Sequence, residues 1–179
     1  MTVAAFLDRD GVINVDHGYV SSWDHFEFIS GVPEALRSLS EVGYELVVVS
    51  NQSGIGRGFY TEADLTRLNE QINDYLKTEV GVRIGGFYHC PHHPTDAQGE
   101  FLMQCECRKP APGMIHQATR DLDIDLGGSL LVGDKDSDIQ AGRAAGIGRL
   151  FKVSPASESA GLDADVESVT ALPDVLNRL

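Results

Sequence analysis

The sequence lacks the features that direct a chain to a membrane or out of the cell. Its first residues do not join a basic segment to an apolar segment and a small-residue cleavage site, as secretory leaders do. No apolar run approaches the roughly 20 residues that span a bilayer. These absences predict a cytoplasmic protein that does not insert into a membrane.

Basic residues are also few. Fourteen Lys and Arg stand against 27 Asp and Glu, for a formal net charge of −13 at pH 7. Nucleic acids and anionic membranes bind to basic surfaces, so we expect neither as a partner. The same negative field would repel an anionic small molecule unless basic side chains gather where it binds.

Cysteine is scarce, and its number is odd. Three cysteines cannot all pair with one another, and in a reducing compartment metal binding is the better explanation. They lie in a long irregular stretch with two histidines, and side chains two positions apart face the same way on an extended chain. The sequence predicts a structural zinc site in a loop of about residues 90–107, with Cys90, His92, Cys105 and Cys107 as ligands. His93 is the alternative fourth ligand, and three free thiols in a surface loop are the alternative to a metal site.

Strand and helix patterns alternate along the 179 residues, which are enough for one domain with its own core. Short apolar runs predict strands at residues 3–7, 46–49, 86–89, 129–133 and, as an outer strand, 149–153. Helical spacing predicts helices at residues 34–42, 61–80, 112–122, 139–145 and 172–179, with a surface loop at 154–165. This alternation predicts an α/β fold: one domain over residues 1–179, with a Rossmann-like parallel sheet, helices on both faces and the zinc loop inserted.

Two carboxylates follow the first predicted strand. Asp8 and Asp10 are two positions apart and can face one centre, and Gly11 lets the backbone turn. Such a pair can hold a divalent cation, share a proton, or divide the roles of nucleophile and general acid. An isolated Asp-x-Asp is equally typical of a solvated acidic turn, so the other strand ends decide between these interpretations.

Polar side chains follow the other predicted strands as well. Ser50 ends the second strand, Lys109 follows the last predicted zinc ligand, and Asp134 and Asp138 follow the strand at 129–133. Carboxyl ends of parallel strands meet at one edge of a sheet, where ligands bind. Phosphoryl transfer needs an oxygen nucleophile, a cation, further positive donors and an acid for the leaving oxygen. The sequence offers each of these at that edge.

The motifs resemble, in order, those of the haloacid dehalogenase-like (HAD) phosphatases. They are Asp8-Arg9-Asp10-Gly11-Val12, Ser50, Lys109 and Gly133-Asp134-Lys135. Residues 14–20, 51–58, 90–94 and 105–110 are similar to segments of the D-glycero-D-manno-heptose 1,7-bisphosphate 7-phosphatases. The resemblance covers nearly the whole chain and weakens after Val153. It implies a HAD-like fold, and the segments after Asp10 and before Cys90 are too short for a separate cap domain.

The resemblance also implies roles for the matching residues. Asp8 would attack phosphorus and form an aspartyl-phosphate, and Asp10 would protonate the leaving oxygen and then activate water. Ser50 and Lys109 would bind the phosphoryl oxygens. The implied ligands of a catalytic Mg²⁺ are Asp8, the Asp10 backbone carbonyl, Asp134 and the Lys135 backbone. The implied substrate-binding residues are Asp16, His17, Gly18, Tyr19, Ser50, Asn51, Gln52, Ser53, Arg57, Arg108 and Lys109.

The implied reaction is removal of the C7 phosphate of the heptose bisphosphate by a monomeric enzyme with a small sugar phosphate substrate. Three alternatives stay open: a histidinol-phosphate phosphatase, a phospho-accepting receiver-like module, and a zinc-stabilised binding protein with an inactive site. Five basic residues in or beside the motifs, Arg9, Arg57, Arg108, Lys109 and Lys135, can make a positive pocket in the acidic protein. Ordinary salt bridges are the alternative for Arg9 and Arg57.

Overall fold

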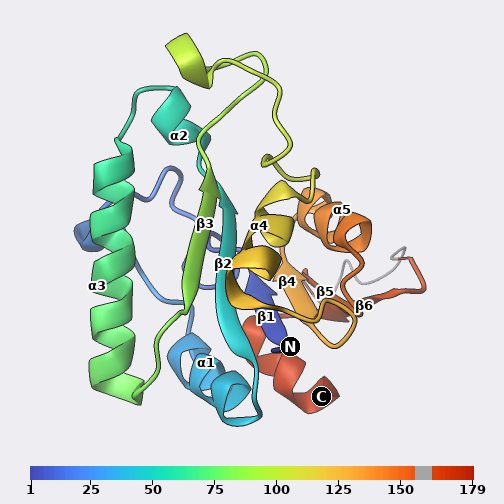
Figure 1. The fold of residues 1–179 in the computed structure, drawn as a ribbon. Coiled ribbons are helices and arrows are strands. Elements are labelled where there is room, and N and C mark those ends of the chain that lie inside the picture. Colours follow the sequence, from blue (N-terminus) through green and yellow to red (C-terminus); the bar gives the residue numbers. More distant parts are fainter. Residues whose placement is uncertain (156–162) are drawn as a thin grey trace.

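The computed structural model describes residues 1–155 and 163–179, and the described strands form one parallel sheet (Figure 1). The strand order is β3-β2-β1-β4-β5-β6. The strands are β1 (Ala4–Leu7), β2 (Glu45–Asn51), β3 (Gly86–Cys90), β4 (Leu130–Gly133), β5 (Arg149–Val153) and β6 (Val166–Val169). Because every pair is parallel, the carboxyl ends of all these strands lie at the same edge of the sheet.

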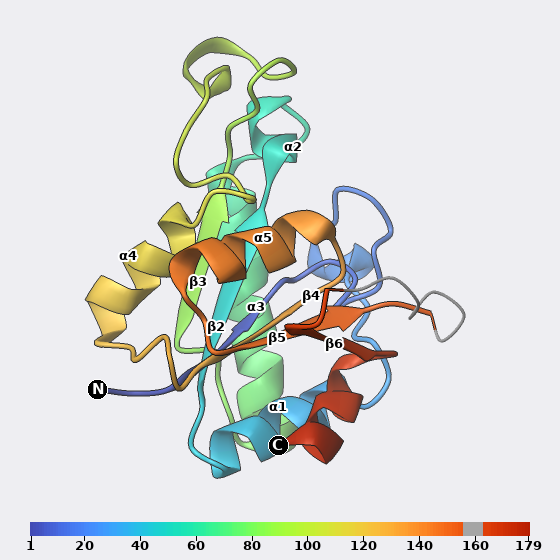
Figure 2. The same cartoon turned by 90° about the vertical axis from the view of Figure 1, so that its right-hand side faces the viewer.

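Helices cover both faces of the sheet, so the predicted α/β architecture is confirmed (Figure 2). One face packs against α1 (Val32–Glu41), α3 (Glu62–Val80) and the 3₁₀ helix η4 (Leu172–Arg178). The other packs against α4 (Gly113–Leu122) and α5 (Asp136–Ala145). Side chains alternate along a strand, so neighbouring residues of β1 pack on opposite faces of the sheet. Leu7 packs in the core under α1, α3 and η4, called the first core, and Phe6 packs in the second core, under α4 and α5.

The sequence prediction is wrong at the last edge of the sheet. Residues 149–153 were expected as the outer strand, but β5 pairs with β6 through Leu150↔Val166 to Val153↔Val169. The segment Val-Glu-Ser-Val of β6 holds only two apolar residues, so it does not stand out as a strand. Part of the predicted loop at 154–165, residues 156–162, lies outside the described residues.

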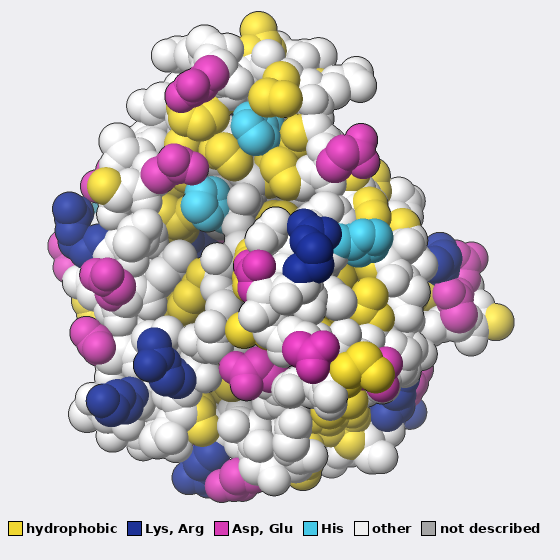
Figure 3. Space-filling view, in the orientation of Figure 1, with side chains coloured by type: hydrophobic (Ala, Val, Ile, Leu, Met, Phe, Trp, Pro, Cys, Tyr) yellow, Lys and Arg dark blue, Asp and Glu magenta, His cyan; other side chains and the backbone are white. Residues whose placement is uncertain are grey.

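Irregular segments gather at the carboxyl edge. They include the loop at 90–107 with the 3₁₀ helix η2 (Gly99–Phe101), the short α2 (Ser53–Gly56) and the segment after β1, which continues to the 3₁₀ helix η1 (Trp23–His25) beside α3. On the face drawn in Figure 3, hydrophobic and histidine side chains gather toward the top, where Figure 1 places the 90–107 loop. Lys and Arg side chains are scattered among Asp and Glu over the middle and lower part of this face. Within the described ranges, none of the helices has the length and apolar character that crossing a bilayer requires.

The helix α1 provides a test of the core. Leu39 is fully buried in the first core, whereas Val42, which caps the same helix, is 63% exposed. Leu39→Ala is expected to lower the free energy of unfolding by about 2–5 kcal/mol, because it removes buried methyl groups and leaves a cavity. Val42→Ala should change it by no more than about 0.5 kcal/mol. Urea denaturation measures both, and equal losses would contradict this packing.

Candidate active site

A buried ammonium group joins β1, β2 and α5 at the carboxyl edge. Lys109 Nζ donates to Asp8 Oδ1 at 2.8 Å and to the Val49 carbonyl at 2.7 Å, and lies 2.6 Å from Asp138 Oδ1. Asp8 follows β1, Val49 belongs to β2, and Asp138 lies in the first turn of α5, after β4. All three charged side chains are buried. The structure therefore brings the predicted nucleophile and the predicted lysine into direct contact.

Three carboxylates lie together beside this ammonium. Asp8, Asp134 and Asp138 each offer an oxygen, and these atoms lie within 4.8 Å of one another. Asp134 Oδ1 is buried and has no hydrogen-bond partner among the described residues. Buried carboxylate oxygens without donors are costly, and a divalent cation with oxygen ligands removes that cost. The donor set therefore fits Mg²⁺.

Gly11 leaves room for the Asp134 carboxylate among these three acidic side chains. Its φ of +87° is unfavourable for other residues, and a Cβ atom there would lie 2.4 Å from Asp134 Oδ2. Any side chain at residue 11 would therefore displace the Asp134 carboxylate.

The pKa shifts of Asp8, Asp134 and Lys109 reflect an excess of carboxylates over ammonium in this cluster. Burial raises the pKa of Asp8 to about 7; Lys109 opposes this shift, and Asp138 and Asp134 reinforce it. Burial also raises the pKa of Asp134. For Lys109, burial lowers the pKa, but the adjacent Asp8 and Asp138 outweigh it, so the pKa is raised and the group stays an ammonium. One ammonium does not balance three carboxylates, and a divalent cation would favour the ionised form of Asp8.

Asp10 is held by a separate set of donors. Its Oδ1 accepts from Arg9 Nη2 at 2.9 Å and from Asn14 Nδ2 at 3.0 Å. Arg9 is fully buried, and the same nitrogen donates to the Val20 carbonyl at 2.5 Å. Arg9 therefore forms an ion pair with Asp10, in agreement with the salt-bridge alternative, and ties the general-acid candidate to the segment after β1.

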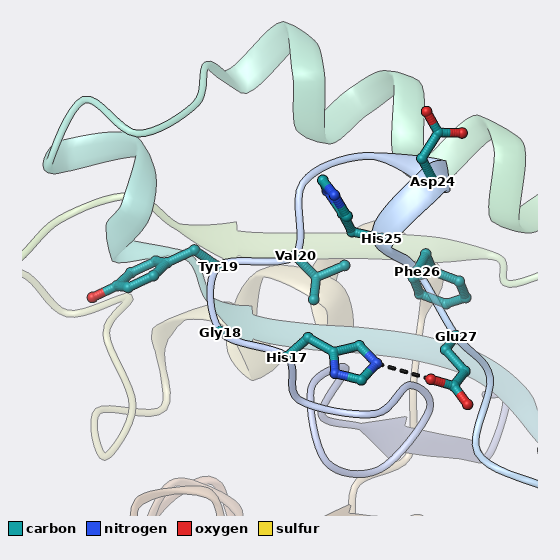
Figure 4. A pocket seen from close by; sticks show the side chains of 8 residues that line it. All are labelled: His17, Gly18, Tyr19, Val20, Asp24, His25, Phe26 and Glu27. Carbon is teal, nitrogen blue, oxygen red and sulfur yellow. Dashed lines mark hydrogen bonds and ion pairs between the residues drawn. The ribbon is translucent and has the colours of Figure 1, made fainter.

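A cavity of about 290 Å³ lies next to Asp10. Six predicted substrate-binding residues line it, namely Asp16, Gly18, Tyr19, Asn51, Gln52 and Ser53, together with Asp10, Gly54, Tyr60 and Lys135. His17 lines a neighbouring cavity of about 430 Å³ instead, where its Nε2 lies 2.8 Å from Glu27 Oε2 (Figure 4). The structure thus places six of the eleven predicted substrate residues around one cavity; the other five, His17, Ser50, Arg57, Arg108 and Lys109, do not line it.

The two predicted substrate arginines are bound to protein groups. Arg57 Nη1 lies 2.5 Å from Asp96 Oδ2, and its Cζ lies 5.8 Å from the centre of the Tyr19 ring. Arg108 Nη1 donates to the His92 carbonyl at 3.3 Å. Neither arginine lines the 290 Å³ cavity. Their part in substrate binding stays a prediction, and the Arg57 pair agrees with the salt-bridge alternative.

The four predicted zinc ligands form a compact cluster. Cys107 Sγ lies 3.0 Å from Cys90 Sγ, 3.3 Å from Cys105 Sγ and 3.3 Å from His92 Nδ1. Cys90 Sγ lies 3.5 Å from Cys105 Sγ and 3.6 Å from His92 Nδ1. Four sulfur and nitrogen atoms so arranged fit a tetrahedral Zn²⁺ with no position left for substrate. His93 is outside the cluster, because its Nδ1 accepts from the backbone amides of Thr95 and Asp96.

This cluster lies close in the chain to the buried lysine. Lys109 comes two residues after Cys107, and its backbone forms two hydrogen bonds with the Asn51 side chain, of 3.0 and 3.1 Å. The end of β2 thus holds the backbone of Lys109, two residues after the last member of the ligand cluster. A metal in the loop would act on catalysis by placing the lysine.

The sequence did not predict the roles of three residues of the site. Asp138 was expected at this edge of the sheet, but its contact with Lys109 requires the fold. Asn14 lay in a segment that resembles the heptose phosphatases, but its hydrogen bond to Asp10 was not predicted, and Tyr60 was not singled out at all. Lys135, a predicted backbone ligand of Mg²⁺, uses its carbonyl to accept from the Asp138 amide at 3.1 Å, whereas its side chain lines the cavity.

The two histidines allow a test of the zinc site. His92→Ala is expected to be purified with almost no zinc and with a lower unfolding temperature, because three thiolates leave the tetrahedron incomplete. His93→Ala should keep about one zinc per chain, since its ring only accepts loop hydrogen bonds. Mass spectrometry after desalting measures the zinc content per chain of both variants. Loss of zinc from His93→Ala but not from His92→Ala would reverse the ligand assignment.

Comparison with known proteins places the chain in a family. The family described as HAD-hydrolase-like matches residues 106–170. A D-glycero-β-D-manno-heptose-1,7-bisphosphate 7-phosphatase of Yersinia pestis is 48% identical over 97% of this chain and 94% of its own. The protein of the same name from Escherichia coli K12 is 46% identical over 98% and 94%.

A solved structure agrees with these relatives. The D,D-heptose 1,7-bisphosphate phosphatase of B. bronchiseptica, crystallised with magnesium and phosphate, is 30% identical, with a TM-score of 0.84 over 99% of this chain and 97% of that one. The chain belongs to the HAD-like phosphatases and, within them, to the family of the D-glycero-β-D-manno-heptose-1,7-bisphosphate 7-phosphatases.

Proposed function

We propose that the protein is a Mg²⁺-dependent phosphatase that removes the C7 phosphate of D-glycero-D-manno-heptose 1,7-bisphosphate and leaves the 1-phosphate. The observation that carries the proposal is the buried contact of Asp8 with Lys109, beside the unpartnered oxygen of Asp134. The relatives that share this name are similar over nearly the full chain. Magnesium and phosphate in the B. bronchiseptica structure support the same chemistry.

Asp8, Asp134 and the backbone carbonyl of Asp10 would hold Mg²⁺. The ion would neutralise the charge of the phosphoryl oxygens and of the adjacent carboxylates. A structural Zn²⁺ would occupy the cluster of Cys90, His92, Cys105 and Cys107.

Phosphoryl transfer begins at Asp8. A carboxylate oxygen of Asp8 forms a bond to phosphorus while the bond from phosphorus to the C7 oxygen breaks. Asp10 gives its proton to that leaving oxygen and is then a carboxylate, which Arg9 and Asn14 stabilise. The products of this step are the heptose 1-phosphate and an aspartyl-phosphate.

Hydrolysis reverses the role of Asp10. Its carboxylate takes a proton from water as the water oxygen attacks phosphorus. The bond between phosphorus and Asp8 breaks, which releases phosphate and regenerates the Asp8 carboxylate. Lys109 has three donors, and Asp8, Asp138 and the Val49 carbonyl take all of them. A phosphoryl oxygen therefore has to replace one of these acceptors when it binds to the lysine.

The broader assignments belong to the same proposal. We infer one domain over residues 1–179, a monomer, a cytoplasmic location and a small sugar phosphate as the partner rather than nucleic acid or membrane. The net charge of −13 supports the last point, and so does the scatter of basic side chains among acidic ones in Figure 3.

The direct test compares substrates and a nucleophile variant. With Mg²⁺, the wild type is expected to release phosphate from one or both anomers of the heptose bisphosphate with a higher kcat/KM than from histidinol phosphate. Asp8→Asn should lower kcat by at least about 10³-fold, because an amide oxygen is a poor nucleophile. Asp123→Asn, at a side chain 84% exposed, is the matched control and should keep full activity.

Three results would contradict this proposal. A preference for histidinol phosphate would support that alternative. Labelling by a small phosphodonor without turnover would support a receiver-like module. Full activity of Asp8→Asn would remove the nucleophile assignment.

A further inference from the structure

Gln52 connects the two functional groups that the mechanism treats separately. It follows β2 directly, and its side chain is buried against the active site. Its Nε2 donates to Ser50 Oγ at 2.6 Å and lies 3.5 Å from Asp10 Oδ2. One amide nitrogen thus faces both the hydroxyl expected to bind the phosphoryl group and the general-acid carboxylate.

The orientation of this amide is fixed by its other end. Tyr60 OH donates to Gln52 Oε1. If the amide were rotated by half a turn, Oε1 would face the Asp10 carboxylate and Nε2 would face the phenol. While Asp10 is a carboxylate, two acceptors would then meet there, so the orientation in the structure is the favoured one, with the Tyr60 phenol as the donor to Oε1.

Tyr60 is well placed to keep this role. Its ring packs in a small cluster with Ile55 and Leu65. A Cβ atom on Gly54 would lie 2.2 Å from the Tyr60 ring, so the glycine lets the ring lie against the backbone of α2. Burial raises the pKa of Tyr60 to about 12, which leaves the phenol protonated at neutral pH.

The orientation of the amide determines what Ser50 can do. A hydroxyl has one proton, and an oxygen that accepts from Gln52 keeps that proton for another acceptor. Ser50 Oγ therefore has its donor free for a phosphoryl oxygen. With the amide rotated, Gln52 Oε1 would compete for the same proton.

We propose that Tyr60 is a positioning residue for phosphoryl transfer: through the Gln52 amide it directs the Ser50 hydroxyl proton toward the phosphoryl oxygens and holds the donor that faces Asp10. This inference rests on the proposed phosphatase function, but it applies to any phosphomonoester that the site accepts. Tyr60 also lines the 290 Å³ cavity, but its phenol oxygen is hydrogen-bonded to Gln52, and we expect its effect on kcat to pass through that amide.

The test is a double-mutant cycle on kcat and KM. Tyr60→Phe removes the phenol oxygen alone and is expected to lower kcat by about 10- to 100-fold, as the loss of orienting partners does elsewhere, with KM changed far less. Gln52→Ala should lower kcat at least as much. In the Gln52→Ala background, Tyr60→Phe should have no further effect, because the residue through which it acts is gone.

Two further variants keep the test decisive. Tyr88→Phe is the matched control: Tyr88 lies in β3, its hydroxyl donates to Asp121 of α4 at 3.1 Å, and the variant should match the wild type. Gln52→Glu keeps an acceptor for Tyr60 but replaces the donor by a second carboxylate, so kcat should fall even if Tyr60→Phe is unstable.

The outcomes separate this inference from the proposed function. p-Nitrophenyl phosphate and the heptose bisphosphate, both with Mg²⁺, serve as substrates. A wild type that hydrolyses neither overturns both proposals. An active wild type with unchanged kcat in Tyr60→Phe or Gln52→Glu, or with equal effects of Tyr60→Phe in both backgrounds, overturns the positioning role alone.

Discussion

The site depends on one buried ammonium group among carboxylates. Lys109 Nζ lies between Asp8 and Asp138, so it holds the end of β1 against the start of α5. Burial alone would neutralise both kinds of group, and their mutual attraction keeps the lysine charged. Since the carboxylates outnumber the ammonium, the cluster also retains negative charge. This excess of buried negative charge costs stability by itself, and it favours the binding of a divalent cation.

The rest of the carboxyl edge can be understood as support for this contact. The end of β2, through Asn51, forms two hydrogen bonds with the backbone of Lys109, which follows the predicted zinc ligand Cys107 by two residues. Arg9 ties Asp10 to the segment after β1, and Tyr60 orients the amide that faces Asp10 and Ser50. Loops without regular structure thus present a defined constellation, because each is held by buried polar contacts close to the reacting groups.

The sequence predicts most of the strands and several of the site residues, and the features that it does not predict have physical reasons. Strands β1, β2 and β4 are largely apolar and buried, so their sequences stand out, whereas β6 at the edge holds only two apolar residues. Asp8, Asp10 and Asp134 were found because they follow strands. The partnership of Asp138 with Lys109 and of Tyr60 with Gln52 depends on how separate segments meet, which spacing does not encode.

The central claim is that Asp8 carries the phosphoryl group. It is tested most directly by acid quench of the Mg²⁺-loaded wild type with substrate labelled at the C7 phosphate, followed by peptide mapping. We expect transient label on the peptide that contains Asp8, and none in the Asp8→Asn variant. Turnover with no protein-bound label at any quench time, or label on another residue, would contradict it.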